Sequence, residues 1–360
     1  MNYLDLRSLN IEELTSFIRE KGLPAFRARQ IFAWLHQKGV GSFREMTNLP
    51  KELRDMLAEE TDISMSRIIS YQESASGDTV KWLLELADGE RIETVLMHYK
   101  RDESRDRATC CVSTQTGCAM NCAFCATASF AKCRNLTAGE MEAQTLIAAE
   151  EARRHGFDGL TNVVFMGMGE PLANMDNLHR CILLLNNEMG QNIGMRKMTV
   201  STSGLVPGIY QMADWGLQVG LAISLHSASE ETRRKLMPVA GRYSFKELFA
   251  AANYYRQKTG QRVTYEYALF NGINDSTAAA KELVELLSRY DEAKDALINI
   301  IPANYVDKTG FSPSKVESIK EFVRILSSSG ISVQQRESRG QDIDAACGQL
   351  AARNGQSVKL

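Results

Sequence analysis

The sequence predicts an α/β protein with a parallel sheet at its centre. From Thr109 onward, short β-rich runs alternate with amphipathic helical runs. Repeated strand–helix units of this kind build a parallel sheet that is either doubly wound or curled into a full or partial barrel. The chain of 360 residues has 44% hydrophobic and 24% charged residues, as is typical of a globular protein. At roughly 150 residues per domain, this length indicates about two domains, or one large domain with an appendage.

Composition excludes several other classes of protein. A chain of this length can bury a full core without disulfide bonds, which excludes wholesale disorder, a collagen and a small disulfide scaffold. The 42 basic and 44 acidic residues leave a net charge of −2, which argues against a histone-like polycation but not against a local basic face. No apolar run reaches the roughly 18 residues of a membrane span, and the chain begins without a signal-peptide pattern. We therefore expect a cytoplasmic protein without a membrane segment.

Residues 1–62 are predicted to form a small helical domain. Helical apolar spacing runs from residue 9 to 22 and from 26 to 39, and a third helix begins at Pro50, where a missing amide proton costs little. Basic residues outnumber acidic ones in the second half of this segment, with Lys21, Arg27, Arg29, Lys38, Arg44, Lys51 and Arg54 against Glu45 and Glu52. A solvated helix face is the commoner meaning of such a run, and a contact surface for a polyanion is the alternative.

Residues 63–103 are predicted to form a β-hairpin extension. Two β-rich runs between residues 79 and 97 flank Asp88-Gly89, a pair of residues that is a strong hairpin turn signal. The mixed-charge run that follows, residues 99–107, is predicted to be an exposed loop.

Residues 104–340 are predicted to form the parallel sheet and the helices that cover it. The strand candidates are residues 110–114, 162–167, 197–202, 219–225, 262–270, 296–301 and 331–337. One helix is predicted to begin at Thr137 with a capping box to Glu140, and another at Ser312, with Pro313 at the first helical position. In a barrel, the residues that carry chemistry lie at the carboxyl ends of the strands.

Six of the eight cysteines fall between residues 110 and 133. In a reducing compartment, such a cluster indicates metal binding or catalysis rather than disulfide bonds. Cys118, Cys122 and Cys125 form a C-x3-C-x2-C array on the loop after a predicted strand. A structural zinc site needs four ligands, and Cys111, Cys133 or a histidine could supply the fourth. The spacing favours an iron–sulfur cluster, in which three thiolates leave one iron open to a further ligand.

Several motifs in the correct order resemble one family. The cysteine array on the first strand–helix loop resembles the radical S-adenosylmethionine superfamily. Four further motifs resemble the RlmN/Cfr family of RNA adenine methyltransferases within it: Phe165-Met-Gly-Met-Gly-Glu-Pro-Leu172, Ser201-Thr-Ser-Gly204, Ser224-Leu-His226 and Arg339-Gly-Gln-Asp-Ile-Asp-Ala-Ala-Cys347-Gly-Gln-Leu350. The resemblance covers residues 5 to about 352 and includes the N-terminal helical segment. It implies a partial TIM-type (β/α)6 radical-SAM barrel with an RNA-binding accessory domain in front, and a tail, residues 341–360, that carries a reactive cysteine.

The resemblance assigns roles that the residues alone do not. Cys118, Cys122 and Cys125 would hold a [4Fe–4S] cluster, and the cofactor S-adenosylmethionine would contact Gly169, Glu170, Ser201, Ser224, Leu225, His226 and Asn304. Cys347 would accept the methyl group, Cys111 would be the resolving thiol and Glu93 the proton acceptor. Without the resemblance, Glu170 could equally cap a helix, Cys347 would be a buried small residue, and Glu93 a solvent-facing strand residue. Cys110, Cys133 and Cys181 match no family role and are expected to be structural.

The implied activity is methylation of adenine C2 in 23S rRNA, in the peptidyl-transferase region, and of an adenine next to the tRNA anticodon. The alternative is a Cfr-type reaction at C8; Pro171 and Arg339-Gly340 favour the C2 branch. The resemblance also implies two molecules of S-adenosylmethionine per turnover and an electron donor such as flavodoxin, and we expect a monomer. An alternative of another class is a zinc-stabilised RNA-binding module without catalysis.

The chain departs from the family pattern at three positions near the implied site. Ala131 and Lys132 stand where a glycine and an aromatic residue are common, and Ala303 replaces a tryptophan before Asn304. None of these changes removes a cysteine. They predict a different loop beside the cluster rather than a different class of reaction.

Overall fold

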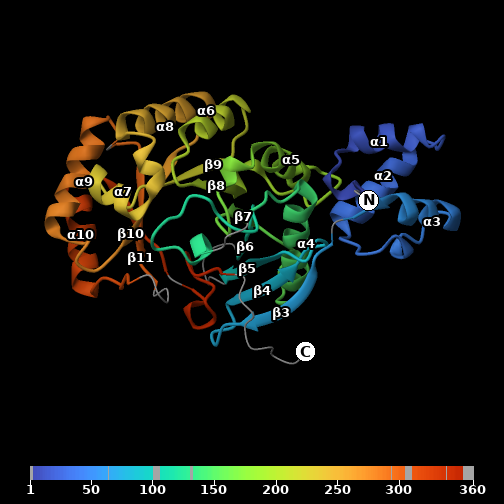
Figure 1. The fold of residues 1–360 in the computed structure, drawn as a ribbon, viewed down its shortest axis with the longest axis horizontal. Helices are drawn as coiled ribbons and strands as arrows, with labels where there is room; N and C mark the ends of the chain where they lie inside the picture. Colours follow the sequence, from blue (N-terminus) through green and yellow to red (C-terminus); the bar gives the residue numbers. More distant parts are fainter. Residues whose placement is uncertain are drawn as a thin grey trace.

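One mixed sheet of ten strands organises the computed structural model, which describes residues 3–63, 65–99, 106–129, 133–292, 294–304, 310–337 and 339–351. The strands follow one another in sequence order across the sheet, from β3 at one edge to β12 at the other. Three N-terminal helices lie at one end of the molecule, and the helices α9 and α10 lie at the other end (Figure 1).

The N-terminal segment is helical, as its apolar spacing predicts. The helices are α1 (Ile11–Glu20), α2 (Phe26–Phe32), which continues into a π-helical turn at Ala33–Gln37, and α3 (Lys51–Glu60). Two short parallel strands, β1 (Leu4–Asp5) and β2 (Thr61–Asp62), join the two ends of the segment. Leu14, Ile31 and Leu57, one from each helix, are fully buried, so the three helices share one core.

The predicted hairpin is part of the main sheet. Its strands are β4 (Thr79–Glu85) and β5 (Arg91–Tyr99), and a third antiparallel strand, β3 (Arg67–Glu73), flanks β4. The sequence does not single out β3, because most of its residues are exposed or half-buried and show no alternation. β5 also pairs antiparallel with β6, so the extension continues the barrel sheet without a break.

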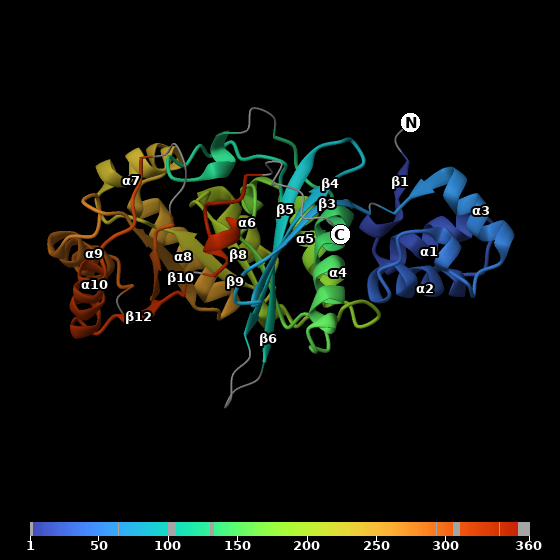
Figure 2. The same cartoon turned by 90° about the horizontal axis from the view of Figure 1, so that it is seen from below.

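Seven parallel strands alternate with helices in the rest of the chain. The strands are β6 (Arg107–Cys111), β7 (Asn162–Phe165), β8 (Met198–Thr202), β9 (Gly220–Ser224), β10 (Val263–Leu269), β11 (Leu297–Pro302) and β12 (Ser332–Gln335). The helices are α4 (Ala138–Arg154), α5 (Met175–Asn186), α6 (Val206–Asp214), α7 (Glu230–Leu236), α8 (Phe245–Thr259), α9 (Thr277–Arg289) and α10 (Val316–Ser328). Among the described strands, β12 pairs only with β11, so the barrel is partial, as expected (Figure 2).

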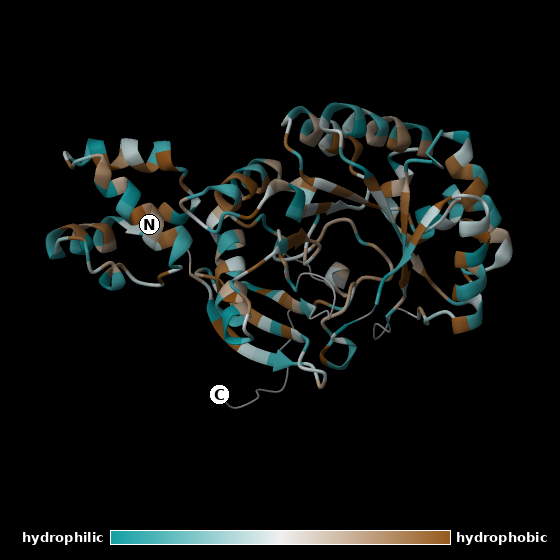
Figure 3. Ribbon diagram, turned by 180° about the vertical axis from the view of Figure 1, so that it is seen from behind, coloured by the Kyte–Doolittle hydropathy of each residue, from teal (hydrophilic) through white to brown (hydrophobic). Residues whose placement is uncertain are grey.

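The core lies between the sheet and these helices. Fully buried strand residues such as Val163, Val200 and Ile298 belong to one large apolar cluster with helix residues such as Leu178 and Leu283. The helices carry alternating hydrophobic and hydrophilic bands (Figure 3), as expected of elements that bury one face. Among the described residues, no helix has both the length and the apolar character needed to cross a bilayer.

Two local predictions can be compared directly with the structure. The capping box at Thr137 and Glu140 is present and starts α4. The helix predicted to begin at Ser312 is present, but its predicted start is wrong, because α10 begins at Val316 and Pro313 instead forms an isolated β-bridge with Phe270. The Ser312 carbonyl accepts the backbone N–H of Asn271 at 3.0 Å, so this stretch is held extended by a partner far away in the sequence.

Some of the predicted features are only partly described. The exposed loop predicted at residues 99–107 begins and ends in strands, since Tyr99 belongs to β5 and Arg107 to β6. Residues 100–105 of that loop, Ala131 and Lys132, and residues 352–360 of the C-terminal tail lie outside the described part of the chain.

Candidate active site

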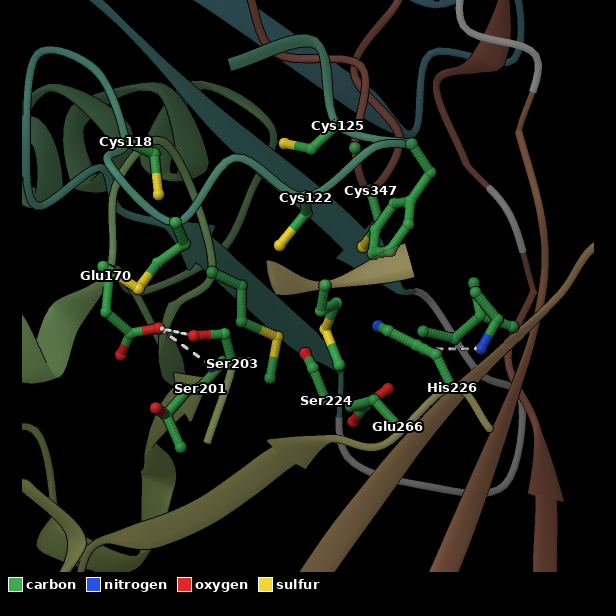
Figure 4. A pocket seen from close by; sticks show the side chains of 18 of the residues that line it. Cys118, Cys122, Cys125, Glu170, Ser201, Ser203, Ser224, His226, Glu266 and Cys347 are labelled. Carbon is green, nitrogen blue, oxygen red and sulfur yellow. Dashed lines mark hydrogen bonds between the residues drawn. The ribbon is translucent and has the colours of Figure 1, made fainter. Parts of the chain in front are cut away.

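The carboxyl ends of the parallel strands face one pocket. Its wall includes residues from the loop after β6, from the ends of β7 through β11, from the segment after β12 and from the C-terminal loop. In chain order these are Cys118, Cys122, Cys125, Gly169, Glu170, Ser201, Ser203, Ser224, His226, Glu266, Asn304, Arg336 and Cys347. Most of these side chains point toward the same open space (Figure 4). The pocket is therefore at the edge of the sheet where a barrel places its chemistry.

The three array cysteines lie on one loop and face this pocket (Figure 4). Burial, with smaller contributions from the nearby Glu170 and Cys125, raises the pKa of Cys118 to about 12. Burial also raises the pKa of Cys122 and of Cys125. Thiols in such a setting ionise only beside a positive partner, which a bound metal group supplies.

Three thiols on one loop match the number of protein ligands that leaves one iron of a [4Fe–4S] cluster open to a further group. Within the described residues, no group of three or more His, Cys, Asp or Glu is placed to hold a single metal ion. A [4Fe–4S] cluster is held by thiolates arranged around its outside. Cys118, Cys122 and Cys125 are the residues that would hold it here.

Glu170 is fixed at the rim of the pocket by its hydrogen bonds. The carboxylate accepts the backbone N–H and the hydroxyl of Ser203, both at 2.8 Å, and the backbone N–H of Leu172 at 3.1 Å. Burial raises the pKa of Glu170, and the bonds from Ser203 oppose that shift. Glu170 thus both caps a short helical turn and presents a carboxylate to the pocket (Figure 4).

The glycine before Glu170 is required by close packing. Gly169 has a φ of +103°, and a Cβ atom on it would lie 2.6 Å from the Cβ atom of Gln115. Gln115 in turn accepts the backbone N–H of Glu170 at 2.8 Å through its side-chain oxygen. The side chain of Gln115 therefore sets the position of Glu170.

The segment after β9 presents His226 in a defined tautomer. Its Nδ1 atom accepts the backbone N–H of Ala268 at 2.9 Å, so the proton of the neutral ring lies on Nε2. Burial lowers the pKa of His226 to about 3, and Arg233 adds to that shift. Ser201 and Ser224 also line the pocket. Leu225 does not lie in the pocket wall; its side chain is fully buried and its backbone N–H binds the Glu266 carbonyl.

The loop that carries Cys347 lies against the cluster loop. The backbone N–H of Ala126 donates to the Gly348 carbonyl at 2.9 Å, and the Thr127 hydroxyl donates to the Leu350 carbonyl at 2.8 Å. The side-chain amide of Asn304 donates to the Cys347 carbonyl at 3.2 Å. Cys347 itself is exposed. These bonds hold an exposed thiol beside Cys125, from which it is separated by more than 200 residues of sequence.

Cys111 and Cys347 share a second pocket next to the first. Both line it, together with Cys125, Met166 and Arg336. Cys111 is buried at the end of β6, and its pKa is raised by burial and by the nearby Cys347. The neighbouring Cys347 sulfur raises the pKa of Arg336, so that a cation lies beside both thiols. The structure therefore brings together the two cysteines that the resemblance pairs.

Glu93 is buried, contrary to the usual setting of a strand glutamate. It is 4% exposed, and its carboxylate lies 3.2 Å from the Lys81 ammonium and accepts the backbone N–H of Ala351 at 2.7 Å. Its side chain lies in the wall of neither pocket. Ser113 connects the backbone of Glu93 to the segment that leads to Gly169. The Ser113 hydroxyl donates to the Glu93 carbonyl at 2.5 Å and accepts the Met168 N–H at 2.9 Å.

The other cysteines differ in burial. Cys110 and Cys181 are fully buried, and Cys133 is exposed. Burial raises the pKa of Cys110 to about 12, and the Thr94 hydroxyl lies 3.7 Å from its sulfur. Inert core thiols have this environment.

Several residues of the site have no clear sequence signal. Ser203, rather than Ser201, binds Glu170, and only its place in the Ser201–Gly204 motif points to it. Glu266 and Arg336 come from β10 and from the segment after β12. A polar residue in a strand that is otherwise apolar, as Glu266 is in β10, is the only hint that the sequence offers.

Comparisons with known proteins extend over nearly the whole chain. Residues 112–287 match the family described as the radical SAM superfamily, and residues 4–63 match the N-terminal domain of ribosomal RNA large subunit methyltransferases. A probable dual-specificity RNA methyltransferase RlmN of Bacillus licheniformis is 44% identical over 97% of this chain and 94% of its own length. One of the same name from Desulfitobacterium hafniense is 45% identical over 97% of both chains. The crystal structure of a radical SAM methyltransferase from Sphaerobacter thermophilus, 44% identical, covers 97% of this chain and 100% of its own, with a TM-score of 0.91.

Proposed function

The chain belongs to the RlmN family of radical S-adenosylmethionine RNA methyltransferases, and from this premise we propose that it methylates carbon C2 of adenine. The proposed substrates are an adenine in the peptidyl-transferase region of 23S rRNA and an adenine next to the tRNA anticodon. The relatives are named dual-specificity RNA methyltransferases, which supports two classes of RNA. The same reaction at C8 is the alternative.

The shared pocket of Cys111 and Cys347 is the observation that carries this proposal. A binding module needs no pair of thiols beside three further cysteines on a neighbouring loop. A reaction that passes a carbon through one sulfur and releases it with another needs both thiols within reach of one another and of the cofactor. The bonds from Ala126 and Thr127 to the Cys347 loop supply that proximity.

The family works with a [4Fe–4S] cluster and S-adenosylmethionine, and the residues of this chain fit both. Cys118, Cys122 and Cys125 are proposed to hold the cluster. The Glu170 side chain, held by two hydrogen bonds from Ser203, is suited to accept a hydrogen bond from the ammonium group of an amino acid. The proposed cofactor site also includes Gly169, Ser201, Ser224, His226 and Asn304, which line the same pocket, and the backbone of Leu225.

When bound, these groups supply the methyl carbon and the one-electron chemistry that the electron-poor ring carbon of adenine requires, and two cofactor molecules are consumed per turnover. The protein itself aligns the reacting groups. The Cys347 sulfur accepts the methyl group. That carbon would lose one hydrogen atom to the radical derived from the second cofactor molecule and then bond to the adenine ring, so that an S–CH2–C link joins protein and RNA. Glu93 takes the proton from the ring carbon, and the one electron left on the ring would return to the group held by Cys118, Cys122 and Cys125.

Cys111 completes the proposed reaction. Its sulfur attacks that of Cys347, and a Cys111–Cys347 disulfide forms while the S–CH2 bond breaks. The electron pair of that bond stays with the carbon, which takes a proton and becomes the methyl group of the product. Arg336, beside both sulfurs, favours the thiolate that attack requires.

The adenine must leave its stack to reach a pocket inside the barrel mouth. The exposed basic residues Arg29, Lys38, Arg44 and Lys51 of the N-terminal helices are proposed to bind the RNA backbone and bring the base to the site. Lys38 lies over the ring of Trp34 at 3.5 Å, which combines a cation and an aromatic surface, the two elements that single-stranded RNA favours.

Anaerobic turnover tests the proposal. Reconstituted protein is incubated with S-adenosylmethionine, a reductant and protein-free rRNA or tRNA, and the RNA is digested for mass spectrometry of its nucleosides. 2-Methyladenosine is the expected product. If 8-methyladenosine forms instead, the proposed mechanism stands but the methylated carbon is C8 rather than C2. If a brown protein cleaves the cofactor but yields no methylated adenosine, the proposed RNA substrate is wrong.

A further inference from the structure

Lys81 lies beside Glu93 in the interior of the hairpin extension. The two residues come from the paired strands β4 and β5 and are diagonal neighbours on one face, since Leu83 is the direct partner of Glu93. The Lys81 Nζ atom lies 3.2 Å from Glu93 Oε1, and their side chains are only 8% and 5% exposed. A buried charge of either sign is stable only with its partner, so each residue holds the other in place.

The same pair also holds the loop that carries Cys347. Lys81 Nζ donates to the Asp344 carbonyl at 3.2 Å, and Glu93 Oε2 accepts the backbone N–H of Ala351 at 2.7 Å. These two contacts lie three residues before and four residues after Cys347. The buried pair thus binds the segment that carries Cys347 at two points, one on each side of that residue, and so forms a tether.

Other contacts hold the loop as well. Asn304, Ala126 and Thr127 bind its centre at the carbonyls of residues 347, 348 and 350, and two side-chain contacts bind its start. Asp342 accepts the backbone N–H of Ala75 at 2.8 Å, and Arg339 pairs with Asp78. Both therefore anchor the start of the loop to the turn between β3 and β4. Lys81 differs from them because it contacts the loop and Glu93 with one ammonium group.

We propose that Lys81 is a positioning residue that couples the charge of Glu93 to the placement of the Cys347 loop. The inference rests on the proposed function, in which Glu93 takes the ring proton and Cys347 then moves to Cys111. When the Glu93 carboxylate takes that proton it becomes neutral, and Glu93 itself accepts no electron. Its ion pair with Lys81 is lost, and the hydrogen bond from Ala351 loses a charged acceptor, which makes it weaker. The bonds from Asn304, Ala126 and Thr127 remain, so the loop is loosened only at its Lys81 and Glu93 contacts, and only after the ring proton has gone, which is before the disulfide step.

Amide hydrogen exchange of the holoenzyme tests the tether without any reaction on RNA. In Lys81→Met, and in Glu93→Gln, which mimics the protonated carboxyl, the segment 341–351 should exchange about tenfold faster than in the wild type. Lys81→Arg keeps the charge and should restore slow exchange. Lys235→Met, which breaks the surface pair of Lys235 with Glu231 at 2.7 Å, is the matched control and should exchange like the wild type in this segment.

Folding can be separated from the tether. Lys81→Met leaves a buried carboxylate without its cation, which can destabilise the protein. The double variant Lys81→Met/Glu93→Gln removes both charges and should fold with its cluster, as judged by absorbance, while segment 341–351 still exchanges fast. Slow exchange in this double variant would overturn the proposal.

Turnover with RNA supplies the second readout. Lys81→Met should cleave the cofactor at close to the wild-type rate but accumulate the protein–RNA crosslink, with methylated RNA reduced about tenfold or more. A parallel loss of cluster, cofactor cleavage and product would indicate a structural role only and contradict the proposal. If the wild type makes no methylated adenosine but the exchange results are as expected, the proposed function fails and the tether stands. If methylation proceeds and Lys81→Met exchanges like the wild type, the tether fails alone.

Discussion

The Nδ1 atom of His226 accepts the backbone N–H of Ala268 at 2.9 Å, so this buried imidazole is locked as the neutral ring with its remaining proton on Nε2. The side chain is 4% exposed and lines the candidate pocket. The Nε2–H group of His226 is therefore a hydrogen-bond donor of fixed direction in the wall of the pocket proposed for the cofactor.

The protonation state of His226 predicts a pH effect on stability. Its pKa is lowered to about 3 in the folded protein, against about 6.5 in the unfolded chain. Between these values the unfolded chain binds the extra proton, so stability is full above pH 6.5 and falls as the pH drops below it. From pH 7 to 5.5, urea unfolding should show about 1 kcal/mol more loss in the wild type than in His226→Gln. Equal losses in both proteins would show that His226 is protonated in the fold.

Replacement of Cys111 by alanine should trap the reaction. Without the second thiol, the S–CH2–C link cannot be broken, so the protein–RNA adduct should accumulate and methylated RNA should fall by at least about 100-fold. A denaturing gel with labelled RNA measures the adduct. Cys133→Ala, at an exposed cysteine, is the control and should turn over without an adduct. Methylation of RNA by Cys111→Ala at the wild-type rate and without an adduct would refute the proposed role of Cys111.

Glu170→Gln should weaken binding of S-adenosylmethionine. The amide keeps the shape of the side chain but loses the charge that would pair with the ammonium group, and a charged hydrogen bond is worth about 1.5–3 kcal/mol, or roughly 10- to 100-fold in Kd. Anaerobic equilibrium dialysis gives the Kd, and absorbance checks that the cluster is retained. Glu231→Gln, in a surface ion pair, should bind as the wild type does. An unchanged Kd in Glu170→Gln would remove Glu170 from the cofactor site.

Gly169→Ala should cost more stability than an alanine at a glycine of similar backbone. Gly169 and Gly272 both have positive φ values, +103° and +71°, but only at Gly169 would a Cβ atom meet a neighbour, Gln115, at 2.6 Å. Gly272→Ala should lose about 1 kcal/mol from backbone strain, and Gly169→Ala about 2–4 kcal/mol. Denaturant unfolding of the two variants measures the difference in their free energies of unfolding. Equal values would show that the segment around Gln115 moves aside without loss of stability.

Reversal of two N-terminal charges should weaken RNA binding and its salt dependence. Arg27 is half-buried and Arg29 exposed on α2. If each contacts one phosphate, Arg27→Glu/Arg29→Glu should flatten the slope of log K against log salt by about 1.4 to 1.8. The control reverses Lys281 and Lys320, exposed residues of α9 and α10 at the opposite end of the molecule (Figure 1). Equal slopes for both double variants would exclude α2 from the RNA-binding surface.

The elements predicted correctly from sequence are those whose cause is local. Thr137 and Glu140 form their capping box within one turn, and Asp88-Gly89 lies at its hairpin turn between β4 and β5. Pro313 has an equally good local signal but pairs with Phe270, 43 residues earlier. The local helix-start signal was overridden there by pairing with a residue too far away in the sequence to be seen in a local pattern.

The site residues that could be predicted from the sequence are those that belong to short motifs. The cysteine array and the Gly169-Glu170 pair are compact signals, and the structure places both at the pocket. The burial of Glu93 was not predictable, because it depends on Lys81 in the neighbouring strand and on Ala351, 258 residues away. Ser203 was missed because the choice between Ser201 and Ser203 depends on where each hydroxyl points in the folded chain.

The C-terminal loop that carries Cys347 packs against strands that are synthesised much earlier, and this fixes the order in which the site can be assembled. Residues from β4 and β5, from the loop after β6 and from the last described turn must all meet before Cys347 is in place. Contacts of such long sequence separation form late in folding. A nascent chain can fold its N-terminal helices and most of its barrel before Cys347 has been made, so the sulfur proposed to accept the methyl group joins the site after the strands that surround it.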